Sequence, residues 1–322
     1  MRTAIVQAGM AGAIWGAVIA VPSLIPDVHP VVISCVRFML YGAFATLLAL
    51  PYARALHARL TRRDCLLLLE LAFTGNLAYF ILLSTAVQYA GVPIASLING
   101  LIPVAIMLMG RRHSQAGLAT MLCALALILA GILLMNLPAV LDVIDGEASP
   151  DRLVGALCAA LGVLSWSWFA LRNAQLLKSG RYRPREWSTL LGISTGLVAV
   201  LASFLLALLQ PQLLPLDLPA ERIWAFIAAS LFLAIAGSWI ANALWNASAQ
   251  YLPVALSGQM IVFETLCALL YGYLLAWALP SGAQALGIAL ILGGVFWIIR
   301  AEGRGEPPTA PKSKPTKHLS GK

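Results

Sequence analysis

The chain contains 322 residues, of which 61% are hydrophobic and only 11% are charged, with a formal net charge of +8. Soluble domains carry about 25% charged residues, so this composition excludes a water-soluble protein and favours an integral membrane protein. The positive charge does not indicate a nucleic-acid partner, because Lys and Arg lie in short segments between apolar stretches and in the C-terminal tail.

Ten apolar stretches are each long enough to form a transmembrane helix. They are predicted at residues 3–21, 31–51, 65–90, 93–110, 117–137, 153–177, 186–209, 223–249, 254–278 and 283–300. The first stretch lacks a small-residue cleavage pattern, so we interpret it as a retained helix and not as a signal peptide. The predicted fold class is all-α integral membrane, with ten transmembrane helices.

The charges between these stretches predict the orientation in the membrane. Lys and Arg gather in alternate segments, at positions such as Arg59, Arg111, Arg181 and Arg300, whereas Asp and Glu dominate the remaining segments. Cytoplasmic loops of membrane proteins are enriched in Lys and Arg. We therefore predict a multi-pass protein of the plasma membrane, the inner membrane in a bacterium, with both termini in the cytoplasm.

The second half of the sequence repeats the first. The pair Gln88-Tyr89 returns 162 residues later as Gln250-Tyr251, and the segment 126–131 (ALILAG) returns at an offset of 163 as 289–294 (ALILGG). Each copy contains five apolar stretches, and an odd number places the second copy upside down relative to the first. Inverted repeats are typical of secondary transporters, whose substrate site lies between the repeats near the bilayer midplane.

The domain boundaries follow from this repeat. We predict that residues 1–137 form the first five-helix repeat, 138–152 an external linker, 153–300 the second five-helix repeat, and 301–322 a disordered cytoplasmic tail. The tail is rich in Pro and Lys and has no apolar periodicity. It is expected either near anionic lipid or simply in solvent.

Polar and aromatic residues gather near the middle of several predicted helices. The candidate substrate-binding residues are Trp15, Asn76, Tyr79, Ser96, Asn99, Trp166, Trp239, Asn242 and Asn246. Aromatic walls with a few amides are typical of a pocket for an organic solute. The alternative is that each Ser and Asn joins two helices by a hydrogen bond and that the tryptophans pack against small residues. A second group near helix ends is expected in the interfacial aromatic belt: Trp187, Trp224, Trp277 and Trp297.

Glu264 is predicted near the bilayer midplane, within the helix at 254–278. The repeat offset of 162 matches its neighbour Thr265 with the helix-breaking Pro103. A charged carboxylate at the bilayer centre costs about 2.5–3.5 kcal/mol, so it must be protonated, paired or in contact with water. One hypothesis is that Glu264 exchanges protons and couples export to the proton gradient. The alternative is a structural ion pair with Arg37, in the helix at 31–51.

The sequence contains no motif for a cofactor, a metal ion or a nucleotide. The five cysteines are widely spaced without a CxxC pair, and the four histidines fall in predicted loops or in the tail. A GxxxxGK[ST] phosphate-binding loop is absent, so the chain itself is not expected to hydrolyse ATP. No paired catalytic residues are recognised, which makes an enzyme the least favoured class.

The chain resembles the EamA family of the drug/metabolite transporter superfamily over about residues 3–300. The resemblance is carried by Ile14-Trp15-Gly16, Arg37-Phe38, the segment 91–104 (GVPIASLINGLIPV), Ser165-Trp166 and Phe263-Glu264-Thr265. It implies two inverted five-helix halves around a central cavity and the export of small metabolites such as amino acids or amphipathic compounds. Proline usually follows the glutamate in this family, and the chain departs from that pattern with Thr265.

The favoured function is a secondary, non-ATP transporter that exports a small organic solute by alternating access. The alternatives are a scramblase for lipids or amphiphiles with the same fold and, less favoured, a membrane-embedded enzyme. The expected partners are the solute and the lipid bilayer, without nucleic acid. The sequence leaves open the identity of the substrate, the direction of transport, the coupling ion and the oligomeric state, a monomer included.

Overall fold

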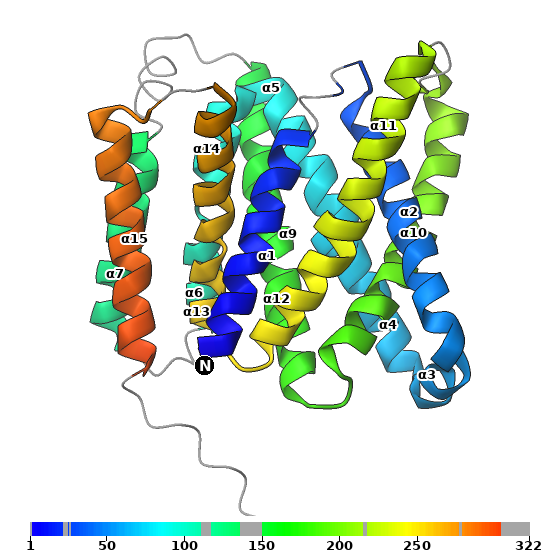
Figure 1. Cartoon of the computed structure of the whole chain (residues 1–322), viewed down its shortest axis with the longest axis horizontal. Helices are drawn as coiled ribbons and strands as arrows, with labels where there is room; N and C mark the ends of the chain where they lie inside the picture. The colour runs from blue at the N-terminus through cyan, green and yellow to red at the C-terminus, as the bar shows by residue number, and fades with distance from the viewer. Residues whose placement is uncertain are drawn as a thin grey trace, which may run out of the picture.

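The computed structural model describes residues 2–21, 25, 27–110, 117–135, 150–214, 218–276 and 279–303. Within these ranges every regular element is a helix, and most of the helices run alongside one another between two ends of the molecule (Figure 1). The prediction of an all-helical fold is therefore confirmed for the described part of the chain. The predicted linker and the predicted tail lie outside it, except where α9 begins and α15 ends.

The helices of the first part of the chain are α1 (Arg2–Ala20), α2 (Pro30–Ala49), η2 (Leu50–Tyr52), α3 (Ala53–Arg59), α4 (Arg62–Leu71), η3 (Ala72–Ala78), α5 (Tyr79–Asn99), α6 (Ile102–Gly110) and α7 (Leu118–Met135). The helices of the second part are α9 (Pro150–Lys178), α10 (Pro184–Leu209), η5 (Pro211–Leu213), α11 (Ala220–Phe232), η6 (Leu233–Ile240), α12 (Ala241–Ala249), α13 (Val254–Met260), α14 (Val262–Ala276) and α15 (Gly282–Gly303). Two of the short elements, η3 and η6, are π-helical.

Several helical runs have the length and composition of membrane spans. Five such runs occur in the described residues, at Val31–Arg59, Arg62–Leu83, Pro150–Lys178, Pro184–Leu209 and Ala220–Ala249. Two shorter apolar helices cover Leu118–Leu134 and Gly282–Trp297. Large apolar side chains such as Trp224 lie on the outside of the bundle, where lipid can surround them. The chain is thus a membrane protein with several spans, and the number of ten stays a prediction.

The helix α5 contains a sharp reversal. Its hydrogen-bonding pattern is helical from Tyr79 to Asn99, yet the Tyr79 hydroxyl donates to Asn99 Oδ1 across 3.2 Å. Twenty residues of straight helix would span about 30 Å, so the chain must turn back between these two residues. Gly91 and Pro93 lie midway, and proline removes a helical hydrogen bond. The predicted boundary between the stretches 65–90 and 93–110 falls at this point.

Four interruptions of regular α-helix occur at repeat-related positions. The π-helical segments η3 and η6 begin at Ala72 and Leu233, 161 residues apart, and end at Ala78 and Ile240, 162 residues apart. The breaks between α5 and α6, at residues 100–101, and between α13 and α14, at residue 261, are 160 to 161 residues apart. The period found in the sequence therefore returns in the irregularities of the backbone.

The helices α7 and α15 lie side by side and run in opposite directions (Figure 1). A Cβ atom added to Gly131 in α7 would lie 2.6 Å from the carbonyl oxygen of Gly287 in α15. A Cβ atom added to Gly294 would lie 2.7 Å from the carbonyl oxygen of Ala124. Contacts thus proceed up α7 and down α15, and glycine permits this close approach at both points.

The helices α2 and α10 pack in the same antiparallel manner. The Ser203 hydroxyl lies 3.0 Å from the sulfur of Met39, and the Tyr41 hydroxyl donates to the Ser188 carbonyl oxygen at 3.0 Å. Residue numbers rise along α2 while those of the contacted residues in α10 fall. This pair joins the first part of the chain firmly to the second and fixes the position of α2 in the bundle.

The start of α10 is buried, contrary to the expectation for Trp187. The Trp187 side chain has no exposed surface, donates from Nε1 to Asn173 Oδ1 at 2.8 Å and stacks on Tyr182 with ring centroids 5.5 Å apart. The prediction of an interfacial position is wrong because the loop between α9 and α10 folds back over the indole. The exposed Trp224 and Trp297 agree with positions at the lipid boundary.

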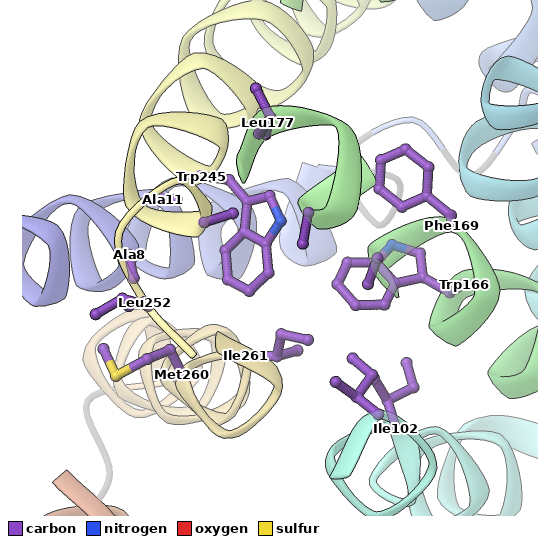
Figure 2. Close-up of a cluster of buried hydrophobic side chains, with 14 of the residues drawn as sticks. Ala8, Ala11, Ile102, Trp166, Phe169, Leu177, Trp245, Leu252, Met260 and Ile261 are labelled. Atoms are coloured by element: carbon purple, nitrogen blue, oxygen red, sulfur yellow. The ribbon is translucent and has the colours of Figure 1, made fainter. Parts of the chain in front are cut away.

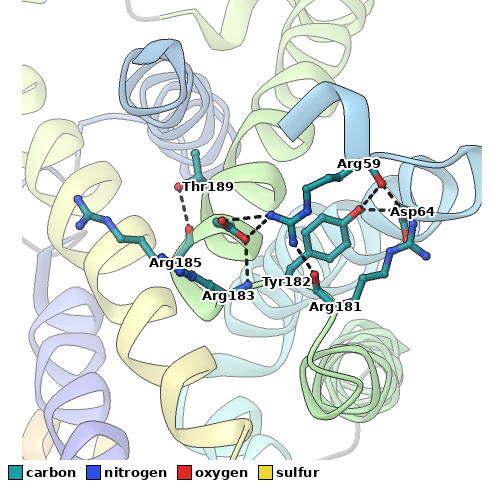
Figure 3. A network of polar contacts seen from close by, with 8 residues as sticks. Arg59, Asp64, Arg181, Tyr182, Arg183, Arg185 and Thr189 are labelled. Carbon is teal, nitrogen blue, oxygen red and sulfur yellow. Dashed lines mark hydrogen bonds and ion pairs between the residues drawn. The ribbon is translucent and has the colours of Figure 1, made fainter. Parts of the chain in front are cut away.

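A polar network connects the α3–α4 segment to the loop between α9 and α10 (Figure 3). We call Arg59, Asp64, Arg181, Tyr182 and Glu186 the loop network. Arg59 pairs with Glu186 at 3.2 Å, Arg181 pairs with Asp64 at 2.8 Å, and the Tyr182 hydroxyl donates to Asp64 at 2.9 Å. Burial and the hydrogen bond to Asp64 raise the pKa of Tyr182, so it remains a protonated donor at neutral pH.

The contact between α7 and α15 can be tested with two adjacent glycines. We expect Gly294→Ala to lower the free energy of unfolding by about 1–3 kcal/mol, because the added methyl group meets the backbone of α7. Gly293→Ala is the matched control, since a Cβ atom there meets no atom within 4 Å. Thermal unfolding of the detergent-solubilised variants measures both changes, and equal stability of the two variants would contradict the described packing.

Candidate functional site

Three tryptophans from three helices meet inside the bundle. The ring centroid of Trp245 in α12 lies 5.6 Å from that of Trp15 in α1 and 6.0 Å from that of Trp166 in α9. Tyr79 in α5 lies 6.4 Å from Trp166 on the other side. Figure 2 shows Ile261, at the break between α13 and α14, pointing towards the same region. We call Trp15, Tyr79, Trp166 and Trp245 the aromatic cluster.

The π-helical segment η6 holds one side of the aromatic cluster. The indole Nε1 of Trp15 donates to the carbonyl oxygen of Gly237 at 2.9 Å. The next residue, Ser238, donates its hydroxyl to the Leu233 carbonyl oxygen at 2.9 Å, five positions earlier in the chain. A π-helix widens the turn and is often found at functional sites. Its irregular backbone here supplies an acceptor for a side chain from another helix.

Arg37 in α2 is buried beside the same segment. Its side chain is 8% exposed, and its Nε donates to the Ser238 hydroxyl at 3.0 Å. The guanidinium carbon lies 5.1 Å from the ring centroid of Phe38 and 5.8 Å from that of Phe80, which places the cation between aromatic rings. The sequence offered Arg37 as a partner for Glu264 in an ion pair, whereas the structure buries it against η6.

Glu264 lies in the first turn of α14, directly after the break at Ile261. Its backbone N–H donates to the Ile261 carbonyl oxygen at 2.9 Å. A Cβ atom on Gly12 would lie 3.0 Å from the Glu264 nitrogen, so only glycine lets α1 approach the start of α14 this closely. The Glu264 charge interacts with Arg37 and with the Tyr79 phenol. Glu264 therefore lies within electrostatic range of both Arg37 and Tyr79.

Arg37 and Glu264 nevertheless do not form a direct ion pair. The four ion pairs between described residues join Arg59 to Glu186, Arg172 to Glu70, Arg181 to Asp64 and Arg222 to Asp27, all with contacts below 4.0 Å. The interaction of Arg37 with Glu264 acts over a longer distance. The structural alternative considered for Glu264, a contact ion pair with Arg37, is not what the structure contains.

The polar candidates of the first part point in two directions. Asn99, at the end of α5, accepts from Tyr79 and so belongs beside the aromatic cluster. Asn76, in η3, donates from Nδ2 to the Thr195 hydroxyl in α10 at 2.9 Å. Asn76 thus makes an interhelical hydrogen bond, the alternative role considered for it. The side chain of Ser96 lies outside the described residues.

The candidates on η6 and α12 use their polar groups in hydrogen bonds within the helix bundle. Trp239 donates to the Thr189 hydroxyl in α10 at 3.3 Å, with Arg185 stacked 5.4 Å from its ring centroid. Asn242 donates to the carbonyl oxygen of Ser238 in its own helix at 2.7 Å. The spacing i, i+3, i+7 of Trp239, Asn242 and Asn246 predicts a common helix face, and Trp239 and Asn246 do donate to adjacent residues of α10, Thr189 and Ser188.

Asn246 belongs to a closed network of buried side chains. It has no exposed surface, accepts from Asn173 Nδ2 at 2.6 Å and donates to the Ser188 hydroxyl at 2.8 Å. Asn173 in turn accepts from the indole of Trp187. Both functional groups of the Asn246 amide are therefore used between α12, α9 and α10, as expected for a residue that joins helices.

Sequence reasoning missed Trp245, which connects Trp15 to Trp166 at the centre of the aromatic cluster. Its partners lie in α1 and α9, far away in the sequence. A signal was available in the composition of α12, where Trp245 stands between the polar Asn242 and Asn246 in a helix that is otherwise small and apolar. Of the predicted residues, Trp15 and Trp166 contact Trp245, and Tyr79 and Asn99 continue the cluster beyond Trp166.

A second charged pair lies on the outer side of α4 and α9. Arg172 contacts Glu70 at 3.3 Å, and the exposed Trp168 donates from Nε1 to the same carboxylate at 2.7 Å. The two charges neutralise one another at the surface of the bundle. The described residues contain no group of three or more His, Cys, Asp and Glu side chains placed to hold a metal ion.

The chain is similar to known membrane proteins. The model of the EamA-like transporter family matches residues 2–137. Inner membrane protein YtfF of Escherichia coli (strain K12) is 32% identical over 314 residues, which cover 94% of this chain and 96% of that protein. A protein of known crystal structure has the same fold, with a TM-score of 0.74 at 20% sequence identity. The match covers 94% of this chain and 99% of that chain.

Substitution of two asparagines tests which one stabilises the fold and which one belongs to the candidate site. We expect Asn246→Ala to lower the free energy of unfolding by about 1–3 kcal/mol, because it leaves buried hydrogen-bonding groups of Asn173 and Ser188 without their partner. Asn99→Ala is the comparison, since it removes one bond to the half-buried Tyr79. Unfolding of the purified variants in detergent measures both, and a loss for Asn99→Ala as large as that for Asn246→Ala would contradict this assignment.

Proposed function

Because the chain belongs to the EamA-like transporter family, we propose that it is a secondary transporter of the inner membrane that exports a small organic metabolite. The cargo is an amino acid or a small amphipathic compound, moved by alternating access without hydrolysis of ATP. Family membership gives the chain a role in membrane transport and points away from an enzyme. The direction, the cargo and the mechanism belong to the proposal.

The proposed architecture has ten crossings in two inverted five-helix halves. The 162-residue period of the sequence and the matching interruptions of the backbone support a duplication. The antiparallel packing of α2 on α10, and of α7 on α15, supports the inversion, because each pair joins corresponding helices of the two copies. Residues 1–137 and 153–300 are the two halves in this proposal, with 138–152 as the external linker and 301–322 as the tail.

The proposed cargo site lies where these halves meet around the aromatic cluster. The observation that carries this assignment is the position of Glu264 and Arg37, two charged side chains that are not paired with each other, beside a set of aromatic rings. Isolated charges inside membrane-spanning segments are costly and mark functional pathways. Trp15, Tyr79, Asn99, Trp166 and Trp245 form the walls of this site.

In this proposal both termini lie in the cytoplasm. The N-terminus, α3 and the end of α15 lie at one end of the bundle, and the loop network lies at the α3 end (Figures 1 and 3). The loops at this end carry Arg54, Arg59, Arg62, Arg181 and other basic residues, as cytoplasmic loops do. The loop network joins the α3–α4 segment to α10 and to the loop before it, and alternating access in this proposal requires these contacts to break.

Purified full-length protein in proteoliposomes tests the proposed function. We expect saturable flux of a labelled solute that accumulates in the medium of cells carrying the gene but not of cells lacking it. A scramblase gives a different result: a fluorescent lipid in the inner leaflet becomes accessible to a membrane-impermeant quencher while no solute crosses. Lipid scrambling without solute flux would favour the scramblase over the proposed transporter. The absence of both activities would rule out both functions.

Glu264→Gln tests the proposed coupling to protons. We expect the variant to lose uphill accumulation under an imposed pH gradient while retaining solute counterflow within about two-fold, because an amide cannot exchange protons but fits the same space. Glu70→Gln is the matched control, since Glu70 already pairs with Arg172, and it should keep uphill transport. Loss of folded protein or of counterflow in Glu264→Gln would assign a structural role to the carboxylate.

A further inference from the structure

Arg37 is the one buried cation of the central region whose hydrogen-bonding capacity is largely unused among the described residues. A guanidinium carries five N–H donors. The structure employs one of them, the Nε–H that points to Ser238. The terminal nitrogens make no hydrogen bond to a described residue, and the residue as a whole is buried.

The surroundings of Arg37 hold it in one orientation. The Ser238 hydroxyl donates its only proton to the Leu233 carbonyl oxygen. Its lone pairs therefore accept the hydrogen bond from Arg37 Nε. Phe38 and Phe80 flank the guanidinium. With the Nε side fixed, the two terminal nitrogens form the free edge of the planar group. A planar edge with parallel donors matches the two oxygens of a carboxylate.

The free edge lies close to the aromatic cluster. A Cβ atom on Gly237 would stand 3.7 Å from a terminal nitrogen of Arg37, and the carbonyl oxygen of Gly237 is the acceptor for Trp15. The indole and the guanidinium are thus anchored to adjacent residues of η6. A ligand that reaches Arg37 with an anionic group therefore has Trp15 beside its apolar part.

The charge of the region selects the kind of anion. Glu264 interacts with Arg37 over a distance, so its negative charge already offsets part of the cation. A singly charged carboxylate adds one negative charge opposite one guanidinium. A doubly charged phosphate would add a second negative charge beside Glu264 and so leave more charge unmatched than a carboxylate does, which is costly in a desolvated site.

We propose that Arg37 binds a carboxylate of the cargo through its terminal nitrogens and that Ser238 positions it for this contact. The assignment rests on the proposed function and narrows the cargo to monocarboxylates that carry an apolar group. Arg37 is then a binding residue, whereas its buried position alone suggested a role in packing. Ser238 acts only through Arg37 and makes no contact with the cargo.

Equilibrium dialysis of the purified full-length protein with two probes of equal shape tests the proposal. The probes are 3-phenylpropionate and its uncharged amide, 3-phenylpropionamide. We expect the wild-type protein to bind the carboxylate about ten-fold or more tightly than the amide, as for a charge-assisted bidentate contact. Arg37→Gln should lose this preference while its affinity for the amide stays within about three-fold, because the aromatic contacts remain.

Three further variants complete the test. Arg222→Gln is the control, since Arg222 pairs with Asp27 outside the aromatic cluster, and it should keep the full preference. Arg37→Lys should keep the charge but lose most of the preference, because an ammonium group lacks the parallel donors. Ser238→Ala should weaken carboxylate binding and leave amide binding unchanged. If Arg37→Gln does not fold, the carboxylate preference of Arg37→Lys and of Ser238→Ala tests the proposal instead.

The outcomes separate this proposal from the proposed function. Binding of neither probe, equal binding of both by the wild-type protein, or a full preference retained in Arg37→Gln overturns the role of Arg37. The same holds for a full preference retained in both Arg37→Lys and Ser238→Ala. Saturable solute flux in proteoliposomes would leave the transport function standing in each of these cases, whereas the absence of solute flux would remove that function independently.

Discussion

The structure depends on one constraint, which is that backbone N–H and C=O groups surrounded by lipid must be satisfied within the chain. Regular helix meets this constraint along most of the described residues. The regular α-helix changes to π-helix at η3 and η6, and it is interrupted at residues 100–101 and at residue 261. These interruptions adjoin the aromatic cluster, where other parts of the protein can satisfy the released groups. The carbonyl oxygen of Gly237 is an example, because the Trp15 indole donates to it. Irregular backbone and candidate site therefore occur together for a physical reason.

Much of the architecture could be predicted from the sequence because it follows from period and polarity. Apolar length predicts the helices, and the boundary near residue 91 coincides with the reversal inside α5. The repeat of 162 residues predicts that distant segments correspond, and the interruptions at η3 and η6 recur at this spacing. Trp15, Trp166 and Tyr79 were recognisable as site candidates since large aromatic side chains in the middle of membrane helices need an internal partner.

The directions of side chains could not be predicted in the same way. Face assignments assume 3.6 residues in each turn, and a π-helical turn breaks this rule without a clear sequence signal. Spacing also does not reveal whether a polar side chain lines a site or joins two helices: Trp239 and Asn246 were site candidates, yet both donate to hydroxyl groups of α10, on Thr189 and Ser188. Trp245 was missed because its aromatic partners, Trp15 and Trp166, lie in α1 and α9, far away in the sequence. The burial of Trp187 depends on a loop that covers it, which no local pattern encodes.

The separation of Arg37 from Glu264 is set by helix packing together with the contacts of the Arg37 side chain. Packing of α2 on α10 fixes Arg37 from one side, and the close approach of α1 at Gly12 fixes the start of α14, which carries Glu264. A bundle optimised for stability alone would bring two opposite charges into contact, since isolated charges inside a membrane are costly. Here Ser238 and the rings of Phe38 and Phe80 hold the cation away from that contact. The arrangement is instead suited to a third charged group that enters from solution and completes the interactions, which is what reversible binding requires.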